Sequence, residues 1–134
     1  MKTKNVVAAI ILSKDRSKVF ATARGYGEFK GFWEFPGGKI EPGEKPEEAV
    51  VREIQEELDS LVTVKKQIGT IEYDYPDFHL SMRCFICELI EGELTLKEAE
   101  ASAWLSKDQL YGKVKWLPAD CLILPGVEKY LSNC

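Results

Sequence analysis

The chain has 134 residues, of which 45% are hydrophobic and 30% are charged, and its formal net charge is -4. A chain of this length is expected to form one domain, residues 1–134, with a hydrophobic core of its own. The acidic balance argues against binding to duplex nucleic acid, which relies on a basic surface. Small nucleotides stay open as ligands, because a bound metal ion supplies positive charge locally.

The first apolar segment, residues 6–12, is too short to span a bilayer and is expected to form a buried strand. No cleavage-site pattern follows it. Cys84 and Cys87 form a C-x-x-C pattern. On a strand their odd separation places the two side chains on opposite faces, which favours structural thiols over a zinc or redox site. We therefore expect a cytoplasmic protein without a membrane segment, either a monomer or a weak homodimer.

Strands and helices alternate along the chain. A helix is expected from about Pro46, because proline suits the first turn and an apolar stripe of Val50, Val51, Ile54 and Leu58 follows. Mixed strands with helices on both sides imply an α/β or α+β sandwich. The other expected elements are strands over 18–23, 62–75, 80–89 and 103–105, short extended pieces at 33–35 and 39–41, a brief helix over 106–110, a loop over 117–120 and a last helix over 125–131.

Three acidic residues, Glu53, Glu56 and Glu57, lie on one face of the expected helix, because their spacing is i, i+3 and i+4. Carboxylates this close repel one another by about 0.2–0.5 kcal/mol per pair. A divalent cation among them would remove the repulsion, and all-oxygen ligation suits Mg²⁺ or Mn²⁺. The alternative is an ordinary solvated acidic face.

The segment around this acidic face resembles a known family motif. Residues 37–59 resemble the Nudix box, G-x5-E-x7-R-E-U-x-E-E-x-G-U, in which U is a bulky aliphatic residue. Similarity to the MutT-like branch extends to residues 34–38, 75–77 and 118–120. It implies a Nudix-type α/β/α sandwich with a mixed central sheet. The residues that match the box in register are Gly38, Glu44, Arg52, Glu53, Ile54, Glu56 and Glu57.

The end of the box departs from the family pattern. Asp59 and Ser60 stand where a glycine and an aliphatic residue are usual. Glycine there lets the helix end in a left-handed turn. Asp59 is expected to adopt that conformation at some cost, and Leu61 to fill the apolar position one residue late.

The resemblance implies a metal site built from the box. Glu53, Glu56 and Glu57 would ligate Mg²⁺ or Mn²⁺, with help from the Gly38 carbonyl. Glu44 would either ligate the metal or support the site through a hydrogen bond. Divalent ions screen a polyphosphate, orient the attacking water and stabilise the departing pyrophosphate.

The resemblance also implies the remaining catalytic groups. Arg52 is expected to orient the glutamates, since Arg52 and Glu56 are four residues apart. Glu98 matches a family position that ligates metal or takes the proton from water, and its neighbour Glu100 competes with it for that role. Whether Glu53 or Glu98 is the base stays open at this stage.

Five residues outside the acidic cluster are candidates for binding substrate. Arg24 matches the position expected to reach the phosphates, and Lys39 is a second candidate. Tyr75 and Phe78 would either stack on a base or pack in the core. Asp120 would accept hydrogen bonds from N–H groups of a cytosine, adenine or guanine edge, because an ionised carboxylate only accepts. The alternative for Asp120 is a helix N-cap.

The expected function is therefore Mg²⁺-dependent hydrolysis of a nucleoside triphosphate to the monophosphate and pyrophosphate. The resemblance implies nucleotide-pool sanitation or CTP hydrolysis, with CTP, a modified dCTP and oxidised dGTP all open as substrates. One alternative is hydrolysis of ADP-ribose or a dinucleotide. Another is a non-catalytic nucleotide-binding module, which the complete set of box carboxylates disfavours.

Overall fold

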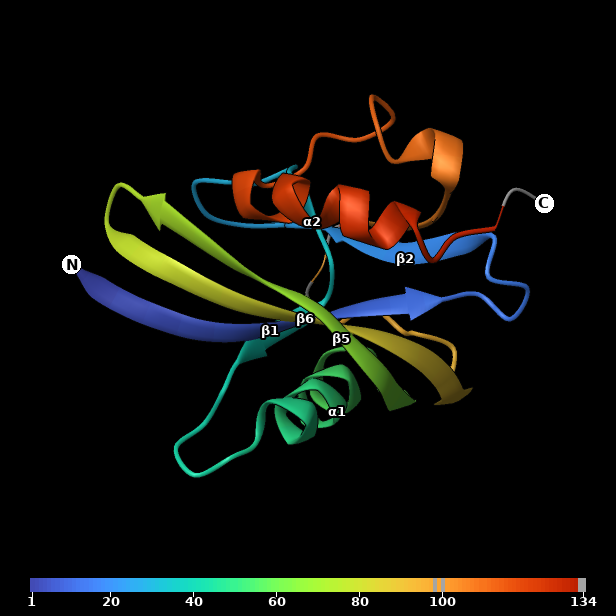
Figure 1. The fold of residues 1–134 in the computed structure, drawn as a ribbon, viewed down its shortest axis with the longest axis horizontal. Coiled ribbons are helices and arrows are strands. Elements are labelled where there is room, and N and C mark those ends of the chain that lie inside the picture. Colours follow the sequence, from blue (N-terminus) through green and yellow to red (C-terminus); the bar gives the residue numbers. More distant parts are fainter. Residues whose placement is uncertain (98, 100, 133–134) are drawn as a thin grey trace.

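In the computed structural model, which describes residues 1–97, 99 and 101–132, two helices lie on opposite faces of a mixed sheet (Figure 1). Seven described strands form the sheet in the order β3-β2-β1-β6-β5, with β4 paired to β1 and β7 to β2. Only the β1–β6 pair is parallel among the described pairs of strands. The expected sandwich with a mixed sheet is confirmed. The elements are β1 Lys2–Leu12, β2 Lys18–Ala23, β3 Trp33–Glu34, β4 Gly37–Lys39, α1 Pro46–Leu58, β5 Leu61–Tyr75, β6 Phe78–Glu91, β7 Ala101–Ser106, the 3-10 helix Lys107–Gln109 and α2 Pro118–Glu128.

The central strand β1 is buried on both faces, and its side chains alternate between two cores. Ala8, Ile10 and Leu12 join the core beneath α2. Val7, Ala9 and Ile11 join the core above α1. Each helix therefore buries its apolar side against one face of the same sheet, and the acidic side of α1 stays available at the edge of this core.

The C-x-x-C pair separates as expected from strand alternation. Cys84 lies in the core beneath α2 and Cys87 in the core above α1. Burial raises the pKa of both thiols to about 12. Both are therefore protonated structural residues and neither is a reactive thiolate.

The end of α1 confirms one expectation and corrects another. Asp59 adopts the left-handed conformation, with φ 49° and ψ 43°. Leu61 does not fill the vacant apolar position, because it is 38% exposed. Ser60 is buried there instead: its hydroxyl donates to the Leu58 carbonyl over 2.9 Å and accepts from the Leu94 N–H over 2.8 Å. Two hydrogen bonds satisfy the hydroxyl, so a polar residue is tolerated in this position.

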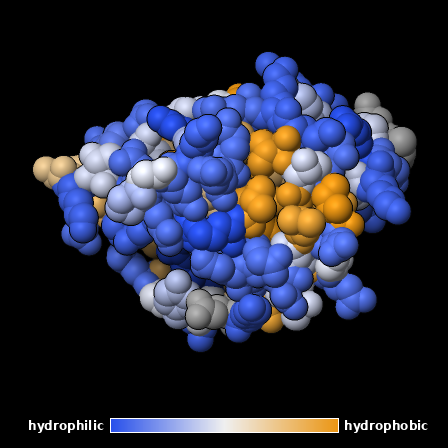
Figure 2. Space-filling model, turned by 90° about the horizontal axis from the view of Figure 1, so that it is seen from below, coloured by the Kyte–Doolittle hydropathy of each residue, from blue (hydrophilic) through white to orange (hydrophobic). Residues whose placement is uncertain are grey.

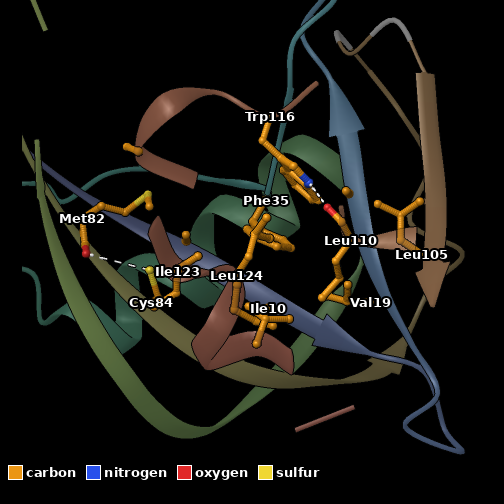
Figure 3. Close-up of a cluster of buried hydrophobic side chains, with 14 of the residues drawn as sticks. Ile10, Val19, Phe35, Met82, Cys84, Leu105, Leu110, Trp116, Ile123 and Leu124 are labelled. Carbon is orange, nitrogen blue, oxygen red and sulfur yellow. Dashed lines mark hydrogen bonds between the residues drawn. The ribbon is translucent and has the colours of Figure 1, made fainter. Parts of the chain in front are cut away.

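The last helix begins earlier than expected. Helix α2 spans Pro118–Glu128, so the prediction of a loop over 117–120 and a helix start near Pro125 was wrong. Pro118 occupies the first turn, where a missing N–H costs nothing. Pro125 lies inside the helix, where burial of Ile123, Leu124 and Val127 against the sheet compensates for the lost backbone hydrogen bond. Figure 3 shows Ile123 and Leu124 among the side chains of this core, with Phe35 and Trp116 nearby.

The apolar stripe of α1 is narrower than expected. Val50, Ile54 and Leu58 are buried, whereas Val51 is partly exposed and borders a shallow groove with Val62 and Val64 of the neighbouring strand β5. Figure 2 shows the molecule from below, on the side where α1 lies: hydrophobic residues gather in one patch of a mostly hydrophilic surface.

Candidate active site

The acidic side of α1 lines a cleft that two adjoining compartments form. One has a volume of about 330 Å³ and the other of about 710 Å³. Glu53, Glu56 and Glu57 line both compartments, as do Arg24 and Glu34. The structure thus brings the predicted glutamates together with Arg24, which lies just beyond the end of β2.

Gly38 and Glu53 are in direct contact. A Cβ atom on Gly38 would overlap the Glu53 carboxylate, so only glycine leaves room for this side chain. A Cβ atom on the neighbouring Gly37 would likewise overlap the Val7 carbonyl oxygen on β1. The tight packing of β4 therefore presents the Gly38 backbone to the carboxylate. Burial raises the pKa of Glu53, and the guanidinium of Arg52 opposes that rise.

Arg52 is the centre of an ion-pair network. Its Nε and one Nη donate to the two oxygens of Glu44 over 2.7 and 2.9 Å. The other Nη donates to Glu56 over 2.9 Å, and a further bond reaches the Lys39 carbonyl. The hydrogen bonds from Arg52 lower the pKa of Glu44 to about 2.

Glu44 is therefore an ionised partner of Arg52. It also accepts the Glu41 N–H over 3.0 Å. Two roles were expected for Glu44, as a metal ligand or as a support through hydrogen bonds, and this arrangement corresponds to the second. Arg52 has its donors committed to protein oxygens, which favours the orienting role expected for it.

Arg24 is held in a bidentate pair. Its Nε and Nη2 donate to the two oxygens of Glu34 over 3.1 and 2.8 Å. Hydrogen bonding to Glu34 raises the pKa of Arg24. The Glu34 partner was not foreseen, because residues 24 and 34 become neighbours only when β2 pairs with β3. Lys39 also lines the larger compartment.

Aromatic side chains also line the larger compartment. Tyr75 and Phe78, which flank the turn between β5 and β6, stack with their ring centroids 5.1 Å apart. Phe29 meets Tyr75 edge to face at 5.6 Å and was missed from the sequence, since nothing distinguishes it from other loop aromatics. Tyr75 is 94% buried and its hydroxyl accepts the Ala119 N–H, so it both packs in the core and borders the cleft.

Asp120 lies in the same compartment as these rings. It is the third residue of α2, so the alternative of an N-cap is wrong; Leu117 takes that position. Its Oδ2 accepts the Phe35 N–H over 2.9 Å. Burial raises the pKa of Asp120 to about 8. Burial thus favours the neutral carboxyl, which carries a donor, over the carboxylate that only accepts and that the sequence led us to expect.

Glu98 and its competitor Glu100 lie outside the described residues. Among the described residues, no three His, Cys, Asp or Glu side chains form a ready-made metal cage. The three glutamates expected to bind metal nevertheless line one cleft, and Glu53 lies against the Gly38 backbone. This donor set consists of oxygen atoms only, which suits a hard divalent cation.

The mixed-sheet sandwich, the glutamate-lined cleft and the spacing of the box residues from Gly38 to Glu57 together define a Nudix-type hydrolase domain. The chain belongs to the Nudix family, since the NUDIX domain matches residues 2–123.

Similar proteins include an 8-oxo-dGTP diphosphatase of Proteus vulgaris, 37% identical over 72% of this chain and 87% of its own length. The CTP pyrophosphohydrolase of Escherichia coli is 32% identical over 98% of this chain and 94% of its own. An ADP-ribose pyrophosphatase of Methanocaldococcus jannaschii is 42% identical over 67% of this chain and 56% of its own. Within the part of the chain that the structure describes, no helix is long and apolar enough to cross a membrane.

Proposed function

We propose that this protein hydrolyses a nucleoside triphosphate to the monophosphate and pyrophosphate with the help of Mg²⁺ or Mn²⁺. The observation that carries the proposal is one cleft lined both by the carboxylates of the acidic face of α1 and by aromatic rings together with Asp120. A nucleotide has the same two parts, a polyphosphate and a base. The 8-oxo-dGTP diphosphatase and the CTP pyrophosphohydrolase, each at least 32% identical to this chain, support this substrate class.

The metal would be held by Glu53, Glu56 and Glu57 with the Gly38 carbonyl. When bound, it supplies positive charge to the phosphate oxygens and activates water. Arg52 orients Glu56 through its hydrogen bond. The proton of the attacking water passes to a carboxylate, for which Glu53 and Glu98 are the two candidates.

Substrate recognition would use both ends of the cleft. Arg24 and Lys39 contact phosphate oxygens. Of Phe78 and Tyr75, at least one ring stacks on the base, and the other either stacks as well or packs against the first. Asp120 contacts the base edge. As a neutral carboxyl it donates one hydrogen bond, so it pairs with an edge that carries an acceptor beside a donor. Cytosine and oxidised guanine both present such edges, which keeps CTP, modified dCTP and oxidised dGTP as candidates.

The test is a panel of nucleotides incubated with Mg²⁺, in which pyrophosphate and orthophosphate release are measured separately. Pyrophosphate from CTP or oxidised dGTP is expected. Tight nucleotide binding without turnover of any substrate would contradict the proposal and favour a binding module.

Under this proposal the protein would act on small nucleotides in the cytoplasm. It would do so as a single domain that needs no duplex nucleic acid.

A second candidate is hydrolysis of ADP-ribose, which the 42% identical pyrophosphatase favours. That relative is longer, and this chain covers 56% of it. Turnover of ADP-ribose to AMP and ribose phosphate, with none of any triphosphate, would establish this candidate in place of the first.

A further inference from the structure

The two compartments of the cleft differ in what lines them beyond the shared glutamates. The larger one reaches the aromatic rings and Asp120. The smaller one lacks these residues and is lined instead by Leu58 at the end of α1 and by Lys97 and Ala99 in the segment before β7. A nucleotide whose base lies among the rings and whose phosphates pass the glutamates would place its terminal phosphates in the smaller compartment.

The described basic residues of the smaller compartment are Arg24 and Lys97. Arg24 donates two hydrogen bonds to Glu34, so much of its charge is already matched. For Lys97 the structure records no hydrogen bond or ion pair with another described residue. Lys97 lines a cavity whose walls also carry four glutamates. Among the described residues of this compartment, Lys97 is therefore the basic residue whose positive charge is not matched by a hydrogen bond or an ion pair.

We infer that Lys97 binds the terminal phosphate of the substrate and the pyrophosphate product, and so makes the enzyme select triphosphates over diphosphates. The inference rests on the proposed function, because it assigns the far phosphates of that substrate to the smaller compartment. In this assignment Lys97 binds the terminal phosphates and offsets their negative charge. The glutamates, which would hold the metal, serve the attacking water.

The chemistry balances with Lys97 in this position. The oxygen of water bonds to the α or the β phosphorus, and the bond from that phosphorus to the oxygen that bridges the α and β phosphates breaks. The water proton passes to the carboxylate base. Attack at the α phosphorus releases pyrophosphate that carries the bridging oxygen, whereas attack at the β phosphorus releases the monophosphate with that oxygen and forms pyrophosphate with the oxygen of water. The products are the monophosphate and pyrophosphate in both cases, and an ammonium group stabilises the negative charge of the pyrophosphate. Removing a charge-assisted hydrogen bond of this kind costs about 1.5–3 kcal/mol, or roughly a 10- to 100-fold change.

The first experiment measures binding of Mg²⁺-pyrophosphate by titration calorimetry to the wild type and to Lys97→Ala and Lys97→Arg. The matched control is Lys14→Ala, which removes an exposed lysine from the turn after β1. We expect a loss of roughly 10- to 100-fold for Lys97→Ala, a small loss for Lys97→Arg and none for the control. Equal binding by wild type and Lys97→Ala overturns the inference.

The second experiment compares kcat/KM for a triphosphate and for the diphosphate of the same nucleoside, for example CTP and CDP. Lys97→Ala is expected to reduce the value roughly 10-fold or more for the triphosphate and less than about 3-fold for the diphosphate. Equal losses on both substrates overturn the role in chain-length selection. A wild type that releases no pyrophosphate from any triphosphate refutes the proposed function instead, and the calorimetry still decides whether Lys97 binds pyrophosphate.

Discussion

Replacing Asp120 by Asn tests the buried carboxyl at the base end of the cleft. The asparagine carbonyl keeps the shape of the side chain and the hydrogen bond from the Phe35 N–H, but it cannot ionise. In the wild type, burial raises the pKa of Asp120 from 3.8 to about 8. The two proteins therefore differ mainly in the cost of ionising this group in the folded state.

The sign and the size follow from proton linkage. The folded pKa lies above the unfolded value, so between about pH 4 and pH 8 the folded state binds more protons and its stability falls as pH rises. The full shift of about 4 pH units corresponds to ~6 kcal/mol at ~1.4 kcal/mol per unit. Between pH 5 and pH 8 the wild type should lose about 4 kcal/mol relative to Asp120→Asn.

The assay is urea denaturation of both proteins at pH 5, 6, 7 and 8, followed by tryptophan fluorescence. Ionisations common to the two proteins cancel in the difference between their free energies of unfolding. A difference that grows in favour of Asp120→Asn as pH rises agrees with a buried, neutral carboxyl. Parallel pH profiles would refute the reasoning, because they would mean that Asp120 titrates normally in the folded protein.

Three further substitutions test the glutamate cluster. Glu57→Gln should reduce kcat by orders of magnitude while the far-UV circular dichroism and melting temperature stay the same; a mild rate loss would remove Glu57 from the metal site. Gly38→Ala should displace the Glu53 carboxylate, because the new Cβ atom would overlap it. Weaker Mn²⁺ binding in a titration is expected, and unchanged binding would contradict the contact. Arg52→Lys should reduce kcat more than it raises KM, since an ammonium cannot make the bidentate bond to Glu44; a change in KM alone would point to substrate contact.

Local patterns in the sequence were enough to predict several features. The opposite orientation of Cys84 and Cys87 follows from strand alternation, and the left-handed Asp59 follows from the need to end α1. The grouping of Glu53, Glu56 and Glu57 follows from helical spacing. These features depend on interactions between residues that are close in the sequence, so they can be inferred from the sequence alone.

Features that depend on contacts between distant residues could not be predicted in this way. The start of α2 at Pro118 is stabilised by packing on the sheet, which overrides the usual effect of Pro125 inside a helix. The burial of Ser60 depends on its hydrogen bond to Leu94. The raised pKa of Asp120 arises because β3 and α2 enclose it next to Phe35, 85 residues away along the chain.

The most direct test of the central claim is a crystal structure with Mn²⁺ and a non-hydrolysable triphosphate, in which anomalous scattering locates the metal. The account predicts Mn²⁺ within about 2.0–2.6 Å of carboxylate oxygens of Glu53, Glu56 and Glu57, and bound also to phosphate oxygens. A nucleotide bound in the cleft with no metal at these three side chains would contradict it.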